Sequence, residues 1–324
     1  MAINLFGLLC SLLAVLWLKT AGQAISLPQY GLLITALALA IPIIVMEWYF
    51  LKPYLNPSAG LLFEWPRFRA SGCIKRTVTK LIGLYVCFAF VAFIYWIFPE
   101  YRGGYYAPFF ELATTVVGYL ALLAWPYFYV MDRLMIKPKD SYWALGAGLF
   151  GQGKLSDWPD IVQLLLGWTV KLFFLPLMFT YASNNLTLLV QYDFSTLFNF
   201  DEAWQAGRSL DLYQFFNNLL FYIDLLFVTV GYCFTVRLFD SHIRSTEPTF
   251  FGWAIALICY QPFWGAVFGS LYISYNAGRD WSNFFWDWPV VHLGYGMLIL
   301  SLVTIYVWAS MAFGIRFSNL THRG

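Results

Sequence analysis

Long apolar runs separated by short polar segments dominate the chain. Eight of them approach or exceed the roughly 20 apolar residues that a helix needs to cross a hydrocarbon core about 30 Å thick. This pattern predicts an all-α fold, a polytopic bundle of about eight transmembrane helices. The expected spans lie near residues 3–18, 30–50, 81–98, 109–129, 161–181, 212–236, 250–272 and 290–313.

The distribution of basic residues predicts the orientation of these spans. Fourteen of the 19 Lys and Arg residues fall in alternate polar segments, at 52–80, 131–160, 237–249 and 314–324. Because an excess of Lys and Arg holds a loop on the cytoplasmic side, we expect both termini to be cytoplasmic. The whole chain, 1–324, is then a single transmembrane domain among membrane lipids, in a bacterial inner membrane or an equivalent membrane. The net charge is only +2, and the placement of the basic residues indicates the topology of the chain. It does not indicate a nucleic-acid partner.

Composition excludes several classes of protein. The chain is 60% hydrophobic and only 11% charged, whereas soluble domains carry about a quarter charged residues. Its five cysteines are scattered with no CxxC pair, so no disulfide framework or zinc site is expected. Three histidines far apart in the chain are too few for a histidine-rich di-iron site, and we expect no metal.

Two ionisable residues fall inside expected spans. Lys171 lies in the fifth and Asp224 in the sixth. Charges at such depth are costly and usually face a protein interior or a water-filled cavity, so these two side chains are expected to pair. The pair would either line a proton or substrate path or fix the register of two helices, and the sequence leaves both alternatives open.

Two other polar patterns have simpler interpretations. Residues 146–151 satisfy G-x-G-x-x-G, but no strand precedes them, so we interpret them as a flexible loop. Asp240, His242 and Arg244 form a polar cluster that we interpret as a solvated loop, since two potential ligands do not make a metal site.

The segment after the last expected span is short and basic. It brings Arg316, Asn319, His322 and Arg323 to the cytoplasmic membrane face. There a charged, water-soluble donor and a lipophilic acceptor could meet, each arriving from its own phase. The alternative is a basic flank that only obeys the charge rule for cytoplasmic loops.

Residues 309–324 resemble the segment that precedes the catalytic region in isoprenylcysteine carboxyl methyltransferase-like membrane proteins. The match is a Ser-Asn-apolar-x-His element at Ser318, Asn319, Leu320 and His322. The resemblance implies a methyltransferase that uses S-adenosylmethionine and acts on a carboxylate or similar group of a lipophilic substrate. It makes Asn319, His322 and Arg316 the residues nearest to the chemistry, and it leaves the cofactor-binding residues unassigned.

The chain also departs from that family, because it contains no His-Pro dipeptide, part of the element that helps to form the family's cofactor pocket. Residues 314–324 are therefore expected to be a cytoplasmic tail leading to a missing catalytic segment, and this chain alone to be inactive. S-adenosylmethionine is expected only if the chain continues beyond Gly324, and otherwise no cofactor. The alternative is a non-enzymatic transporter or assembly subunit that uses Lys171 and Asp224; no protein partner is indicated.

Overall fold

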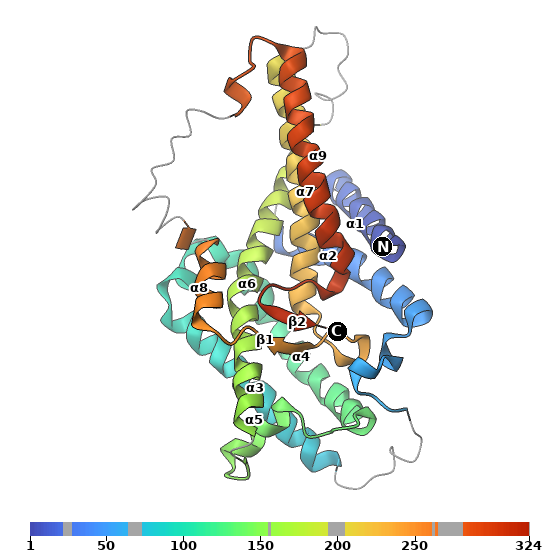
Figure 1. The fold of residues 1–324 in the computed structure, drawn as a ribbon, viewed down its shortest axis with the longest axis vertical. Coiled ribbons are helices and arrows are strands. Elements are labelled where there is room, and N and C mark those ends of the chain that lie inside the picture. Colours follow the sequence, from blue (N-terminus) through green and yellow to red (C-terminus); the bar gives the residue numbers. More distant parts are fainter. Residues whose placement is uncertain are drawn as a thin grey trace.

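The computed structural model describes residues 1–21, 28–63, 73–154, 157–193, 205–260, 263–264 and 281–323. Helices dominate this part of the chain, which agrees with the expected all-α fold (Figure 1). Two helices, α5 (Ser141–Leu149) and α8 (Phe250–Ile258), are short. The long helices are α1 (Ala2–Ala21), α2 (Pro28–Met46), α3 (Cys73–Ile97), α4 (Ala107–Leu134), α6 (Trp158–Gln191), α7 (Ala206–Cys233) and α9 (Pro289–Phe313).

Among the described residues, seven helices are long and apolar enough to cross a membrane, and they are the long helices just named. The chain is therefore a multi-pass membrane protein. The expected span at 250–272 is described only as α8 and the residues that follow it to Tyr260; most of its remainder lies outside the described residues.

The long helices share one apolar core. Helix α1 packs along α2, and α7 lies between α6 and α9 (Figure 1). Buried side chains of α1, α2, α4, α6, α7 and α9 form a continuous cluster that includes Leu39, Phe174, Leu226 and Val307. A second, smaller cluster, Leu81, Leu84 and Phe128, joins α3 to α4.

Polar segments far apart in the sequence meet at one end of the bundle. We call the end formed by residues 47–63, 134–154, 157–158, 234–249 and 314–323 the basic face. The Ile136 amide donates to the Gly60 carbonyl at 3.0 Å, and Asn4 Nδ2 donates to the Met311 carbonyl at 2.7 Å. The beginning of α1 and the end of α9 therefore lie at the same end of the bundle.

A two-stranded antiparallel sheet joins two of these segments. Strand β1 (Ile243–Thr246) pairs with β2 (Thr321–Arg323), so that Ile243 lies opposite Arg323 and Ser245 opposite His322. The register is irregular between Ile243 and Ser245. The sheet fixes the tail after α9 against the segment between α7 and α8 (Figure 1).

Helix α6 is longer than the sequence pattern predicts. The expected span ends at Tyr181, but the helix continues to Gln191. Polar side chains in the last turns do not end the helix, because they bond to its own carbonyls: Asn185 Nδ2 donates to Tyr181 and Thr187 Oγ1 to Ser183, both at 2.9 Å. Apolar residues continue beside them.

Pro176 lies inside α6, where its ring leaves the Leu172 carbonyl without the usual amide donor. Tyr95 of α3 supplies the missing donor, since its hydroxyl lies 2.8 Å from the Leu172 oxygen. The cost of an unsatisfied carbonyl inside the bundle is avoided in this way, and α3 is tied to the middle of α6.

The G-x-G-x-x-G pattern is not a flexible loop. Gly146 and Gly148 lie in α5, which is packed against α3, and only Gly151, with φ +67°, lies beyond the end of the helix. A Cβ on Gly146 would lie 2.0 Å from the Thr79 carbonyl oxygen, and one on Gly83 would lie 2.1 Å from the Tyr142 carbonyl oxygen. Both glycines serve close packing of two helices.

Candidate functional site

A cavity of about 360 Å³ opens between α3, α4, α5, α6 and the segment that follows α7. Its wall has an apolar part and a polar part. Apolar side chains of α3 and α4 form one part, including Leu84, Phe88, Leu120 and Ala124. The other part is polar and belongs largely to the basic face, with Lys171, Thr235, Arg237, His242 and Arg244.

Lys171 lines this cavity from α6. Its ammonium group donates to the Thr235 hydroxyl and lies 5.2 Å from the centre of the Trp168 ring. The Trp168 ring is itself held by a bond of 3.2 Å from Nε1 to the Tyr142 hydroxyl. Among the described residues no carboxylate pairs with Lys171, so its charge is available to an anionic group in the cavity.

Two arginines line the same wall, and they differ in their partners. Arg237 uses Nη1 to bind the Ala59 carbonyl at 3.2 Å, and the described residues give it no carboxylate partner. Arg244 is 3.2 Å from Asp240 and is thereby neutralised. Two carboxylates also line the cavity. Asp160 is exposed, and Asp140 caps α5 at the Trp143 amide, while its other oxygen lies 3.4 Å from Lys80.

The polar cluster at Asp240 is not a solvated loop, because Asp240 is buried and its carboxylate is hydrogen-bonded. Ser58, Asn56 and Arg244 all donate to its carboxylate. Burial opposes ionisation of Asp240, but these hydrogen bonds outweigh it and hold the pKa of the carboxyl below its usual value. Burial and the Arg237 charge lower the pKa of His242 to about 4, against a raising effect of Asp240. The imidazole in the cavity wall is therefore uncharged at neutral pH.

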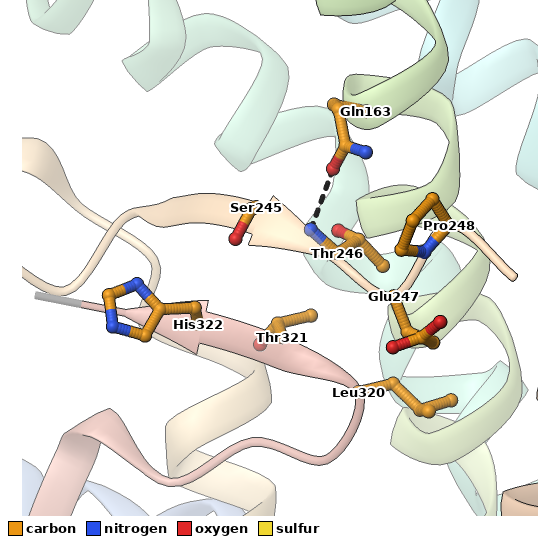
Figure 2. A pocket seen from close by; sticks show the side chains of 8 residues that line it. All are labelled: Gln163, Ser245, Thr246, Glu247, Pro248, Leu320, Thr321 and His322. Carbon is orange, nitrogen blue, oxygen red and sulfur yellow. Dashed lines mark hydrogen bonds between the residues drawn. The ribbon is translucent and has the colours of Figure 1, made fainter. Parts of the chain in front are cut away.

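A second pocket, open and of about 490 Å³, is lined by residues of β1 and β2 and their flanks (Figure 2). His322 of β2 lies at one end of it and Glu247 at the other, while Gln163 of α6 reaches down to the Thr246 amide at 2.7 Å. Gln163 and Ser245 line both hollows, so this tail pocket and the cavity adjoin each other.

The three candidate residues of the tail have different surroundings. Arg316 binds both oxygens of Glu47 at 2.9 Å and the Phe239 carbonyl at 3.1 Å. Asn319 donates from its side-chain Nδ2 to the Tyr260 hydroxyl at 2.7 Å and from its backbone N–H to the Tyr232 hydroxyl. Both are occupied by contacts within the protein. His322, in contrast, lines the pocket beside β2.

The expected pairing of Lys171 with Asp224 is wrong. Lys171 contacts Thr235, whereas Asp224 accepts a bond of 3.2 Å from the Tyr306 hydroxyl of α9. Thr235 lies two residues beyond the end of α7 at Cys233, and that end is nine residues, about 14 Å of helix, beyond Asp224. Helices α6 and α7 are neighbours as expected. Their register, however, sets Lys171 near the basic face and Asp224 deep in the bundle.

An ionic cluster around Lys80 was not predicted from the sequence. Lys80 is completely buried between Asp132, at 3.3 Å, and Asp140, and Arg76 lies 3.0 Å from Asp132. The sequence contained a signal, because Lys80 precedes the third expected span and Asp132 follows the fourth. Both ends lie on the same expected side of the membrane, where opposite charges could pair.

Arg323, the last described residue, is also buried. Its Nη1 donates to the Gly231 carbonyl at 2.7 Å, while Nε and Nη2 have no hydrogen-bond partner. Burial lowers the pKa of its guanidinium to about 10. This residue anchors β2 to the end of α7.

The described residues contain no group of three or more His, Cys, Asp or Glu side chains that could hold a metal ion. Comparisons of the chain with protein-family models, with curated proteins and with solved structures find no match.

Proposed function

We propose that this protein binds an anionic amphiphile, a molecule with an acidic head and an apolar chain, in the cavity. The observation that supports this function is Lys171, an ammonium group without a carboxylate partner among the described residues, in a cavity that has an apolar wall along α3 and α4. We further propose that the basic face is cytoplasmic, so that both ends of the described chain lie on that side, in a bacterial inner membrane or an equivalent membrane.

The two parts of the cavity wall suit the two parts of such a ligand. Each methylene group removed from water against Leu84, Phe88 and Leu120 contributes about 0.8 kcal/mol. The acidic head would lie between Lys171 and Arg237. Since these cations are partly withdrawn from water, their attraction for an anion is stronger than at an exposed surface.

The experiment is equilibrium binding of a fluorescent long-chain fatty acid to the purified protein, with the corresponding fatty alcohol as a neutral comparison. We expect saturable binding of the acid, at least tenfold weaker in Lys171→Met, a loss of about 1.4 kcal/mol. Lys75→Met, an exposed lysine of α3, is the matched control and should bind as the unmodified protein does. Equal affinity of Lys171→Met for the acid would contradict the proposal.

Methyl transfer to the bound acid is a second candidate function. It is supported by the adjacency of the tail pocket to the cavity and by His322 in the wall of that pocket. S-adenosylmethionine would supply the methyl group: an acceptor carboxylate oxygen takes it, the carbon–sulfur bond breaks, and its electrons stay on sulfur. The protein's contribution would be orientation of the acceptor in a water-poor site.

Methyl ester formation should be measured with the full-length native protein and a fatty acid. Its loss in His322→Ala, with fatty-acid binding intact, would support the enzyme. Asn319→Ala tests the second tail candidate, although it also breaks the contact with Tyr260. Unchanged methylation in both variants, or no ester formed by the native protein, would exclude this second function and leave amphiphile binding untouched.

A further inference from the structure

Asp224 is a carboxyl group buried deep inside the bundle. Its residue is 5% exposed and lies on α7 where that helix packs against α9. Nine residues separate it from the end of α7 at Cys233, so it is about 14 Å from the basic face along the helix. If the basic face lies at the membrane surface, this depth falls within a hydrocarbon core about 30 Å thick.

Few polar groups contact this carboxyl. The Tyr306 hydroxyl donates to Oδ2 at 3.2 Å, and Ser310, one turn further along α9, also interacts with it. Oδ1 has no partner with hydrogen-bond geometry. One carboxyl oxygen is therefore held and the other is free.

No described cation pairs with Asp224. Helix α9 carries no Asp, Glu, Lys or Arg, and its one histidine, His292, lies near its other end. Helix α6 carries Asp160 and Lys171, and Lys171 is bound to Thr235, which follows the end of α7 and lies eleven residues beyond Asp224 in the sequence. Tyr260 is the further titratable group that interacts with the carboxyl.

Asp132 provides the contrasting case within the same protein. It is as deeply buried as Asp224, with 2% of the residue exposed, but Arg76 lies 3.0 Å and Lys80 3.3 Å from its oxygens. An ionised carboxylate is tolerated there because two cations compensate it. An ionised Asp224 would have no such compensation, and desolvation therefore favours its neutral, protonated form.

Polar side chains continue from Asp224 toward the basic face. Tyr306 and Tyr260 interact electrostatically, without a described hydrogen bond between them, and the Tyr260 hydroxyl accepts a bond from Asn319 Nδ2 at 2.7 Å. Asn319 belongs to the tail segment at that face. A proton could thus leave the carboxyl by way of hydroxyl groups in otherwise apolar surroundings.

We propose that Asp224 is a proton-binding site in the membrane interior, which holds its proton at neutral pH and exchanges it with the basic face. In the neutral form Oδ1 carries the proton and Oδ2 accepts from Tyr306. This site is separate from the cavity and does not depend on amphiphile binding.

Infrared difference spectroscopy tests the protonation state directly. The protein in lipid vesicles at pH 7 should show the carbonyl stretch of a protonated carboxyl group, and Asp224→Asn should lack it. The amide has the shape of the neutral acid, so this variant is expected to fold. A spectrum in which the two proteins do not differ in that band would overturn the proposal.

Labelling by a hydrophobic carbodiimide locates the site in the unmodified protein. The carboxyl proton passes to a carbodiimide nitrogen, the carboxylate oxygen bonds to the central carbon, and rearrangement leaves a stable N-acylurea that retains the whole reagent. Because the reaction needs the proton, we expect peptide mapping to find the adduct at Asp224 and not at Asp132. The proposal stands only if both measurements agree; an unlabelled Asp224, or equal labelling of Asp132, contradicts it.

Discussion

Arg316 and Glu47, 269 residues apart in the sequence, form a two-pronged ion pair with both N–O distances at 2.9 Å. The pair joins the segment after α9 to the end of α2, and Arg316 also holds the Phe239 carbonyl. Three segments of the basic face therefore depend on one guanidinium group. The Glu47 side chain is only 5% exposed, and Arg316 is the cation that compensates it.

Removal of this partner should destabilise the protein strongly. Arg316→Ala leaves a buried carboxylate alone, which costs roughly 3 kcal/mol in the free energy of unfolding. The double variant Glu47→Ala/Arg316→Ala should lose less than the sum of the two single variants, because it leaves no uncompensated charge. Chemical unfolding in detergent micelles gives the free energies of unfolding of the unmodified protein, the two single variants and the double variant. Additive losses of free energy would show that the two side chains are not coupled.

Lys80 should be essential to the joint between α3, α4 and α5. Lys80→Met keeps the length of the side chain but leaves Asp132 and Asp140 with less compensation, and we expect a loss of about 3 kcal/mol. Lys75→Met on the same helix, where the side chain is exposed, should change stability by less than about 0.5 kcal/mol. Equal melting temperatures of the two variants would refute the role of the buried cluster.

Gly146 should tolerate no side chain. In Gly146→Ala the new Cβ would lie 2.0 Å from a backbone oxygen of α3, which cannot move aside as a flexible side chain could. We expect a loss of about 3 kcal/mol or displacement of α5. Gly148→Ala, two residues along the same helix, meets nothing within 4 Å and should be neutral or slightly stabilising. Thermal unfolding of both variants distinguishes a packing glycine from a flexible one.

His242 should make stability depend on pH in a defined window. Its pKa is about 4 in the folded protein but about 6.5 in an unfolded chain. The unfolded state therefore binds more protons between these values, and the free energy of unfolding should fall as the pH drops from about 6.5 toward 4. The difference corresponds to at most about 3 kcal/mol. His242→Gln should remove this part of the dependence; an identical pH profile in the variant would argue that the imidazole is not buried uncharged.

Much of the helical architecture follows from the sequence, because runs of apolar residues have few alternatives in a bilayer. The end of α6 does not follow, since Asn185 and Thr187 look like loop residues until their side chains are seen to bond to their own helix. The six-residue glycine pattern was misread for a related reason. Only the neighbouring backbone of α3 shows that Gly146 is there for packing.

The candidate site was predictable only in part. Lys171 stood out as a charge inside a span, and the structure places it in the cavity wall. Its partner was not predictable, because helix register depends on how buried apolar side chains fit together, which hydrophobicity alone does not specify. Arg316 and Asn319 show the same limit: their side chains are occupied by Glu47 and Tyr260, residues that the sequence places far away.

The bond from Tyr95 to the Leu172 carbonyl has a consequence for ligand recognition. Because of Pro176, the Leu172 carbonyl lacks its usual amide donor within α6, and this carbonyl belongs to the residue after Lys171. Tyr95 of α3 binds it and so fixes the position of this part of α6 relative to α3. The position of the Lys171 ammonium group relative to the apolar wall of the cavity therefore depends on this contact between α3 and α6. If the cavity binds an amphiphile as proposed, the distance from that ammonium group to the far end of the apolar wall would select acyl chains by their length.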